Sequence, residues 1–412
     1  MKTIVVIVGT VPEAVKLGPV CRALVEHKNV ILTRVILSGQ HRDRVAEILN
    51  LFGIHPDEDL GDQIQKRDLA TMASAILDSL AAALRRLKPD LVVVQGDTTT
   101  AFMAALAAFY EGVPVGHVEA GLTTGNVERP FPEELHRDAI GKTATLLFAP
   151  SARATTHARR IARPTASVFF TGNPCVDALL QFTNDMESNG RSERSPRKKI
   201  LVTVHRRENY ADRGQAIGQA IRAVADDRPD AEIVFVQHNH PALSALTNTL
   251  QQARRLTVLP AQGYRAWLQL LHDCYFVVSD SGGAQEEAPW LKKPLLVLRD
   301  ETERPEVVEA GAAKLVGSDA EAIYRAAVKL LDDEDAYRRM QLERWQYPYG
   351  DGNAAAHIVK HMLLWLNAAR REGNDDCRST RVATPLHFNE ADASSEYRRN
   401  WTYEPDDGFV NV

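Results

Sequence analysis

Cysteine is scarce in this chain of 412 residues, and its placement excludes two classes of small scaffold. The four cysteines lie far apart and form no CxxC pair: Cys21, Cys175, Cys274 and Cys377. We therefore expect neither a disulfide framework nor a zinc ribbon, and the pattern is typical of a reducing compartment. The longest apolar run, residues 101–110, has about half of the ~20 residues that span a bilayer. Because the start of the chain also lacks the pattern of a signal peptide, we expect a cytoplasmic protein with no membrane partner.

An excess of basic residues is also missing. Lys and Arg number 49 against 54 Asp and Glu, so the net charge is −5, and we expect no nucleic-acid partner. There is no GxGxxG after Val8 and no GxxxxGK[ST], which counts against a bound dinucleotide and against P-loop phosphoryl transfer. His238 and His240 could suggest a metal site, but alternate residues of a strand face opposite ways. No third ligand stands at a useful spacing, and we expect neither a metal nor a cofactor.

Short β-branched runs alternate with helical stretches along most of the chain. The expected strands are residues 3–8, 31–37, 91–95, 113–117, 145–148 and 167–171, followed by 200–204, 232–237, 275–279, 294–298 and 314–316. Strands separated by helices predict right-handed βαβ units and parallel sheets. The length suits two domains, so we expect an α/β fold of two doubly wound, Rossmann-like domains with a central cleft.

A polar stretch, residues 184–199, falls between the two series of strands and is either a linker or a surface loop. We expect a first domain over residues 1–172 and a second over 173–352. Residues 369–412 carry many charges and show no apolar period, so we expect a disordered extension there.

Carboxylates follow two neighbouring strands of the first series. Asp97 comes directly after one expected strand, and Glu119 closes the next. Ligands of doubly wound sheets bind at the carboxyl ends of the strands, so these two side chains are expected to point into one cleft. Helix capping by Asp97 or by a neighbouring threonine is the alternative interpretation.

Two charged clusters suggest further chemistry. Glu133 and Arg137 are four residues apart at helical spacing, which fits either a surface ion pair or an arginine that tunes a catalytic carboxylate. His205 and Arg206 follow an apolar run, and such a cluster after a strand suits a phosphate or diphosphate. A solvated basic turn would explain the second cluster equally simply.

Small residues mark another turn between a strand and a helix. Ser281, Gly282 and Gly283 would let backbone N–H groups approach an anion at a helix N-terminus, although an ordinary tight turn is the alternative. Glu287, one turn into the helix, stands where a carboxylate could accept hydrogen bonds from ribose hydroxyls. The helix dipole alone could also explain an acidic residue there.

Together these motifs resemble the non-hydrolysing UDP-N-acetylglucosamine 2-epimerases. The matching stretches include Gly9-Thr10, Pro12-Glu13-Ala14, QGDTTT at 95–100, GHVEAGL at 116–122, HRREN at 205–209, SDSGGAQEEAP at 279–289 and RDETERPE at 299–306. The resemblance covers about residues 1–368. It implies a fold like that of GT-B glycosyltransferases, a homodimer, UDP binding by the second domain, and a helix at about 353–368 that packs back on the first domain.

The resemblance implies interconversion of UDP-N-acetylglucosamine and UDP-N-acetylmannosamine. UDP would be eliminated to give a 2-acetamidoglucal intermediate and would then add back. The proton at C2 is not acidic, so the reaction needs a carboxylate base and an acid on the two faces of the sugar. It also needs cations or N–H groups around the departing diphosphate.

The site residues implied by the resemblance fall into three groups. The catalytic positions are Asp97, Glu119, Glu133, Arg137 and His205. The positions that contact the UDP-sugar are Lys16, Ser281, Gly282, Gly283, Glu287 and Arg304. Positions for activation by the substrate at a second, allosteric site are Gln40, Arg67, Arg206 and His238.

Two positions depart from the family pattern. Val11 stands where the family usually has the arginine of GTRPEA, and Thr123 where it has the arginine of EAGLRTG. They motivate an alternative from another class, a nucleotide-sugar-binding regulatory protein without turnover. A hydrolysing epimerase, an epimerase for a modified UDP-sugar and a glycosyltransferase are further alternatives. Retention of all three carboxylates and Arg137 argues against a decayed site, and it fits an epimerase with a shifted substrate at least as well.

Overall fold

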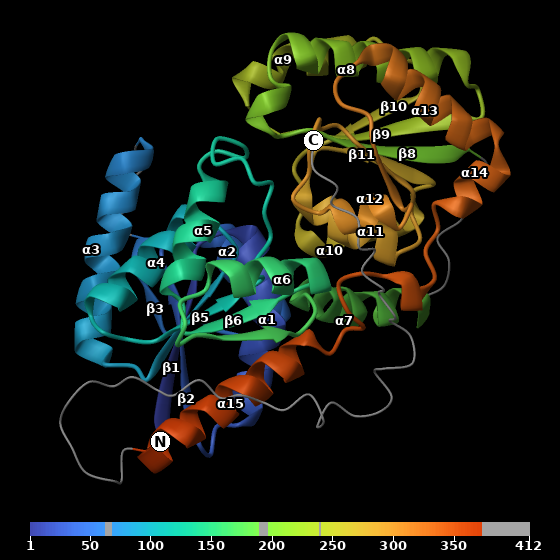
Figure 1. Ribbon diagram of the computed structural model, residues 1–412. Helices are drawn as coiled ribbons and strands as arrows, with labels where there is room; N and C mark the ends of the chain where they lie inside the picture. The colour runs from blue at the N-terminus through green and yellow to red at the C-terminus, as the bar shows by residue number, and fades with distance from the viewer. Residues whose placement is uncertain (62–67, 189–196, 239, 373–412) are drawn as a thin grey trace, which may run out of the picture.

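The computed structural model of the protein describes residues 1–61, 68–188, 197–238 and 240–372. Two parallel β-sheets form its two lobes (Figure 1). The first sheet has the order β3-β2-β1-β4-β5-β6-β7, and the second β10-β9-β8-β11-β12-β13. Every paired strand in the described residues is parallel to its neighbour. The predicted α/β class with two doubly wound sheets is confirmed.

The first lobe is built from the N-terminal elements. Its strands are β1 (Lys2–Val8), β2 (Ile31–Leu37), β3 (Glu58–Asp59), β4 (Leu91–Gln95), β5 (Val115–Val118), β6 (Leu146–Ala149) and β7 (Ser167–Phe170). Its helices are α1 (Val11–Glu26), α2 (Arg42–Leu51), α3 (Leu69–Leu87), α4 (Thr99–Tyr110), α5 (Glu133–Thr143) and α6 (Ala152–Ile161). Alternate residues of β1 face two different cores, with Ile4 packed among residues of α1 and Val5 among residues of α3 and α4. Helices therefore cover both faces of this sheet.

The second lobe repeats this plan. Its strands are β8 (Lys198–Thr203), β9 (Ala231–Val236), β10 (Leu256–Leu259), β11 (Phe276–Ser279), β12 (Leu295–Val297) and β13 (Ala313–Leu315). Its helices are α8 (Asp212–Asp227), α9 (Ser244–Leu250), α10 (Tyr264–Asp273), α11 (Gly282–Trp290), α12 (Pro305–Glu309), α13 (Ala320–Asp332) and α14 (Glu334–Arg339). Most strand predictions are confirmed to within two residues at each end.

Two strands escaped the sequence analysis. The two-residue strand β3 and the short strand β10 each form an edge of their sheet, and each pairs with one neighbour. The side chains of β10 are partly or fully exposed. A short edge strand therefore lacks the continuous apolar run that marks the central, buried strands.

The lobes are joined by helices that share one core. Helix α7 (Pro174–Ser188) packs against α1 of the first lobe and against α10 and α11 of the second. Helix α15 (Ala354–Glu372) crosses back and packs against α1 and α7, and His361 stacks on Phe169 of β7 at 3.9 Å between ring centroids. Asp177 of α7 caps α15 by accepting hydrogen bonds from the backbone N–H groups of Ala354 and Ala355. The domain boundaries at residues 172 and 352 stay a prediction.

The chain crosses between the lobes at two adjacent points. The backbone N–H of Asn173 donates to the carbonyl of Tyr349 at 2.8 Å, and a Cβ at Gly172 would lie 3.0 Å from the same oxygen. Helix α15 continues past residue 368 to Glu372, and the remainder of the expected disordered extension, 373–412, lies outside the described residues. Within the described part of the chain, no helix is both long and apolar enough to cross a membrane.

Candidate active site

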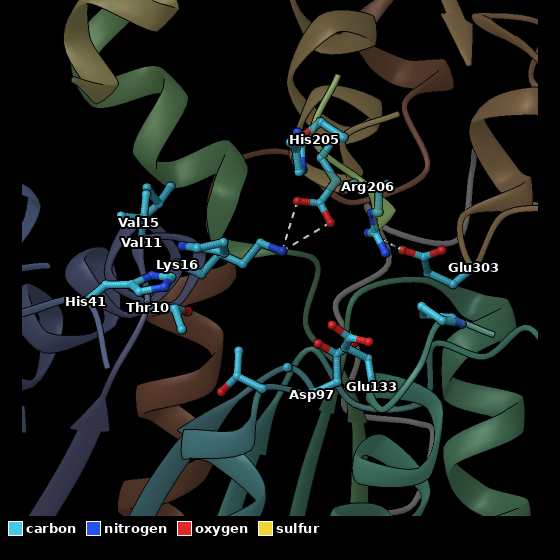
Figure 2. Close-up of a pocket in the computed structure, with 18 of the residues that line it drawn as sticks. Thr10, Val11, Val15, Lys16, His41, Asp97, Glu133, His205, Arg206 and Glu303 are labelled. Atoms are coloured by element: carbon cyan, nitrogen blue, oxygen red, sulfur yellow. Dashed lines mark hydrogen bonds and ion pairs between the residues drawn. The ribbon is translucent and has the colours of Figure 1, made fainter. Parts of the chain in front are cut away.

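A cavity of about 1220 Å³ lies where the carboxyl ends of the two sheets face one another. Figure 2 shows Lys16 and Asp97 reaching into it from the first lobe, and His205 and Arg206 from the second. Predicted site residues on its wall are Lys16, Gln40, Asp97, Glu119, Glu133, Arg137, His205, Arg206, His238, Ser281, Gly282, Gly283, Glu287 and Arg304. Arg67 lies outside the described residues. The structure thus brings the predicted site residues that it describes together around one cavity.

Asp97 is held by an arginine rather than used as a helix cap. Thr98 caps α4, since its hydroxyl accepts a hydrogen bond from the backbone N–H of Ala101 at 3.0 Å. The Asp97 carboxylate pairs with Arg137, whose Nε lies 3.1 Å from Oδ2. Burial would raise the pKa of Asp97, but the Arg137 guanidinium outweighs it and lowers the pKa below its usual value. Asp97 is therefore ionised near neutral pH.

The contacts of Arg137 differ from the simplest helical expectation. Its Nη1 donates to Glu134, three residues earlier, at 2.7 Å, and its other contacts go to Asp97 and not to Glu133. Glu133 instead faces the cavity, and its buried Oε2 has no hydrogen-bond partner among the described residues. Glu134 also accepts a hydrogen bond from the hydroxyl of Thr123. Arg137 thus joins two carboxylates and leaves Glu133 available to a ligand.

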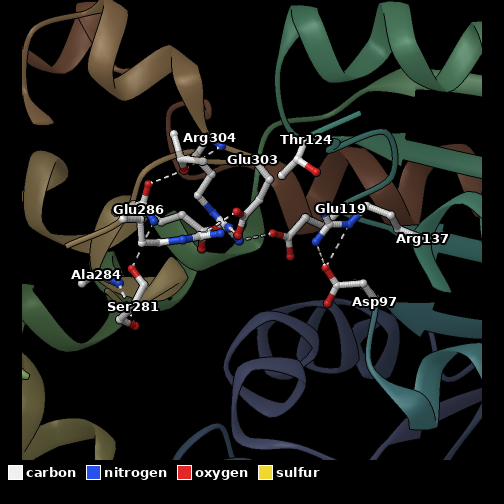
Figure 3. A network of polar contacts seen from close by, with 12 residues as sticks. Asp97, Glu119, Thr124, Arg137, Ser281, Ala284, Glu286, Glu303 and Arg304 are labelled. Atoms are coloured by element: carbon white, nitrogen blue, oxygen red, sulfur yellow. Dashed lines mark hydrogen bonds and ion pairs between the residues drawn. The ribbon is translucent and has the colours of Figure 1, made fainter. Parts of the chain in front are cut away.

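Glu119 belongs to a buried group of charged side chains that connects the two lobes. We call this group the interlobe ion cluster, and its members are Lys16, Glu119, Glu286, Glu303 and Arg304. Figure 3 labels its three glutamates and Arg304. Lys16 Nζ lies 2.6 Å from Glu119 Oε2 and 3.0 Å from Glu286 Oε2. Arg304 donates to the same two carboxylates, at 3.0 Å and 2.7 Å. Each of these side chains is less than one tenth exposed.

The carboxylates of this cluster differ in their affinity for a proton. Burial raises the pKa of Glu119 above its usual value, even though Lys16 and Arg304 act in the opposite direction. Burial also acts to raise the pKa of Glu286, but there the two cations outweigh it and lower the pKa. A carboxyl group with a raised pKa beside an ionised one is an arrangement suited to acid–base chemistry.

The N-terminus of α11 is a candidate anion-binding corner. Ser281 caps this helix by accepting a hydrogen bond from the backbone N–H of Ala284. A Cβ at Gly282 would lie 2.9 Å from Nη1 of Arg304 and 3.4 Å from Nη2 of Arg206, so the two guanidiniums lie close to the backbone of this turn. Two arginines at a helix N-terminus suit a phosphate group. This geometry agrees with the anion-binding interpretation of the Ser281–Gly283 turn.

Sequence reasoning missed the residue that fixes the turn after β8. Asp280 is completely buried and accepts hydrogen bonds from the backbone N–H groups of His205 and Arg206, and from the side chain of Asn209. The ring of His205 lies 4.9 Å from that of His238, and burial lowers the pKa of both histidines. Asp280 directly precedes the turn of Ser281–Gly283, but its partners lie about 75 residues earlier in the chain.

Glu287 has an unexpected partner as well. Its Oε2 accepts a hydrogen bond from the indole N–H of Trp267 at 2.7 Å, and both side chains line the cavity. Burial raises the pKa of Glu287 to about 7. The indole thus fixes the orientation of the Glu287 carboxyl group in the wall of the cavity. No motif in the sequence marked Trp267.

Three of the four predicted allosteric residues lie within the described part of the chain. Gln40, Arg206 and His238 line the same cavity as the predicted catalytic carboxylates. Gln40 follows β2 and accepts a hydrogen bond from the hydroxyl of Thr100 at 2.9 Å, which places its side chain beside the first turn of α4. Among the residues that the structure describes, no group of three or more His, Cys, Asp or Glu is placed to hold a metal ion.

Two doubly wound lobes around a polar cavity are typical of the GT-B-like architecture. A family model described as UDP-N-acetylglucosamine 2-epimerase matches residues 23–363. The UDP-N-acetylglucosamine 2-epimerase of Bacillus subtilis (strain 168) is 40% identical over 363 residues, which cover 88% of this chain and 95% of the relative. That of Campylobacter jejuni is 38% identical over 381 residues, covering 89% of this chain and 99% of the relative.

Solved structures lead to the same result. The UDP-GlcNAc 2-epimerase from Neisseria meningitidis bound to UDP-GlcNAc matches with a TM-score of 0.83 and 38% identity, covering 88% of this chain and 100% of that one. The S. aureus MnaA–UDP co-structure matches with a TM-score of 0.83 and 38% identity, covering 89% and 97%. The chain belongs to the UDP-N-acetylglucosamine 2-epimerase family, as its motifs predicted.

Proposed function

We propose that this protein epimerises C2 of UDP-N-acetylglucosamine to give UDP-N-acetylmannosamine, by elimination and re-addition of UDP. The observation that carries the proposal is the placement of three carboxylates and an anion-binding corner around one cavity. The first lobe supplies the carboxylates of Asp97, Glu119 and Glu133. The second lobe supplies the N-terminus of α11 and the adjacent guanidiniums of Arg206 and Arg304. Relatives whose structures hold UDP or UDP-GlcNAc support a UDP-sugar as the substrate.

The site residues take distinct roles in this proposal. Asp97, kept ionised by Arg137, suits the base that takes the C2 proton as UDP leaves. Glu119, whose pKa is raised, suits the acid that protonates the opposite face of C2 as UDP adds back. Glu133 is the third carboxylate within the cavity, and His205 lies beside the expected diphosphate. The groups proposed to hold the nucleotide are Lys16, Ser281, Gly282, Gly283, Glu287 and Arg304. Their N–H groups and cations would stabilise the departing diphosphate.

Deuterium exchange tests the proposed function. The purified protein is incubated with UDP-N-acetylglucosamine in D₂O, and the sugar is followed by proton and phosphorus NMR. We expect deuterium at C2 together with UDP-N-acetylmannosamine, because elimination and re-addition exchange the C2 proton with solvent.

Other outcomes would assign the alternatives. Free N-acetylmannosamine and UDP as the sole products would identify a hydrolysing epimerase. Binding of the UDP-sugar by calorimetry without deuterium at C2 would favour the regulatory protein, and exchange with a different UDP-sugar alone would identify a modified substrate. A sample without protein is the control.

Two further parts of the sequence-based prediction also remain proposals. The homodimer and a second site for activation by the substrate were implied by the resemblance. Gln40, Arg206 and His238 lie within reach of a ligand in the cavity, which supports a second site that adjoins the first. The exposed rings of Phe109 and Tyr110, at the end of α4, supply apolar surface for a partner subunit.

The substitution Val11→Arg is expected to tighten UDP binding. Val11 begins α1 and lines the cavity, so an arginine there would add a cation near the expected diphosphate. A charge-assisted hydrogen bond contributes about 1.5–3 kcal/mol, which predicts an affinity at least about tenfold higher by calorimetry. Val25→Arg is the control, because Val25 lies at the exposed end of the same helix. Equal affinity of the parent and Val11→Arg would place the diphosphate elsewhere.

A further inference from the structure

A buried carboxyl group at the carboxyl ends of the central strands of the first sheet has no part in the proposed reaction. Glu13 lies in the first turn of α1, and its side chain is fully buried. Strands β1 and β4 are neighbours, whereas the helices that follow them, α1 and α4, pack on opposite faces of the sheet. Such a switch point leaves a crevice between the two turns. The Glu13 carboxylate fills this crevice.

The carboxylate ties the turn after β1 to the turn after β4. Its Oε2 accepts hydrogen bonds from the backbone N–H groups of Gly9 at 2.7 Å and Thr10 at 2.6 Å. Its Oε1 accepts a hydrogen bond from the hydroxyl of Thr98. Thr98 directly follows Asp97, so one side chain connects the start of α1 with the turn that presents the proposed base.

The two turns are in close contact at this point. A Cβ at Gly9 would lie 2.1 Å from the hydroxyl oxygen of Thr100 and 2.4 Å from that of Ser38. These two hydroxyl groups are hydrogen-bonded to each other at 2.7 Å. The backbone after β1 therefore abuts the first turn of α4, and a change in the contacts of Glu13 will be transmitted to that turn.

The contacts of Glu13 require a side chain that forms hydrogen bonds at both of its terminal atoms, which an apolar side chain cannot do. All three donors are uncharged, and burial raises the pKa of Glu13 to about 7. An apolar group of the same shape would avoid this desolvation, but it would leave the N–H groups of Gly9 and Thr10 without an acceptor. One oxygen serves both N–H groups while the other reaches Thr98, which is the geometry that couples the two turns.

We infer that Glu13 is a positioning residue that directs the Asp97 carboxylate towards the substrate. Arg137 holds the side chain of Asp97 from α5, and the link through Thr98 to Glu13 holds its backbone from α1. A displacement of about 1 Å in a reacting group can lower the rate about a hundredfold. The expected changes in kcat rest on the proposed function, because they are measured with UDP-N-acetylglucosamine as substrate.

The test compares Glu13→Met and Glu13→Gln in the full chain, with UDP-N-acetylglucosamine as substrate. Methionine has a similar shape but accepts no strong hydrogen bond, so we expect kcat to fall about tenfold to a hundredfold, with KM within about threefold of the parent. Glutamine can accept from Gly9 and Thr10 and can donate to Thr98. It is expected to keep kcat within about threefold of the parent.

Thr98→Val tests the link from its other end. It is expected to lower kcat about tenfold, whereas Thr98→Ser, which keeps the hydroxyl, should stay near the parent. Thr98 also caps α4, so the double variant Glu13→Met/Thr98→Val should be slower than Glu13→Met. Its loss of kcat should still be smaller than the product of the two single losses, because both changes break the same link between Glu13 and Thr98. Parent-like kcat in folded Glu13→Met would overturn the inference. Should Glu13→Met not fold, parent-like kcat in Thr98→Val would overturn it.

A crystal structure of Glu13→Met, or of Thr98→Val if the former does not fold, gives a readout that does not require turnover. We expect the Asp97 carboxylate to be displaced from Arg137. An unmoved carboxylate would refute the positioning role whatever the activity of the parent. A displaced carboxylate in a protein whose parent shows no epimerisation would instead refute the proposed function alone.

Discussion

Turnover in the variant Asp97→Asn is expected to fall about 10²-fold to 10⁴-fold, the range typical for loss of general acid–base catalysis. Asparagine keeps the size of the side chain and can still accept a hydrogen bond from Arg137, so the fold and UDP binding should be retained. It cannot take up a proton from C2. Initial rates and deuterium incorporation at C2 are the measurements, with UDP affinity determined by calorimetry.

Asp138→Asn is the matched control for this substitution. Asp138 lies on α5 directly after Arg137, and its carboxylate has long ion-pair contacts, at 3.9 Å to Lys142 and 3.8 Å to His157. Loss of the Asp138 carboxylate should leave turnover within about twofold of the parent, because surface substitutions usually have small effects. If Asp97→Asn behaved like this control, Asp97 would have no place in the mechanism.

Removal of the guanidinium in Arg304→Met is expected to destabilise the protein by about 3–5 kcal/mol, because it breaks a buried charge network from one side. Arg304 contacts Glu119, Glu286 and Glu303, and all three carboxylates are almost completely buried. Arg299 and Arg206 would still pair with Glu303, but Lys16 alone cannot compensate the charges of both Glu119 and Glu286. Urea unfolding followed by circular dichroism measures the loss.

The pH dependence of this variant gives an additional check. Loss of Arg304 raises the folded-state pKa of the neighbouring carboxyl groups, so these groups bind more protons in the folded variant than in the folded parent. The stability deficit should therefore grow as the pH rises from about 5 to about 8. Arg325→Met, which removes the exposed i,i+4 pair with Glu321, should change stability by less than about 0.5 kcal/mol. An equally small effect of Arg304→Met would mean that the ion cluster does not stabilise the fold.

The sequence was most informative where physical rules act locally. Central strands are buried on both faces and have continuous apolar runs, so they were located to within two residues. Parallel strands end at the same edge of a sheet, and this rule alone predicted that Asp97 and Glu119 share one cavity. The exposed edge strand β10 carried no such signal.

Long-range contacts were the part that local patterns could not provide. Helical spacing favoured Glu133 as the partner of Arg137, but the structure gives Arg137 a partner 40 positions away in the sequence, Asp97. Lys16 and Glu286 are separated by 270 positions and meet only because the two lobes close on each other. The contacts of Asp280 and Trp267 depend on tertiary packing in the same way.

The shared core formed by α7 and α15 has a consequence for protein engineering. Residues of α1, α7, α11 and α15 belong to one continuous apolar cluster, so neither lobe would bury its own surface if the chain were cut between the sheets. A chimaera that exchanges the nucleotide-binding half for that of a relative must therefore carry both crossing helices, or redesign their contacts with α1. Recombination breakpoints chosen from the two sheets alone would leave apolar faces exposed and favour aggregation.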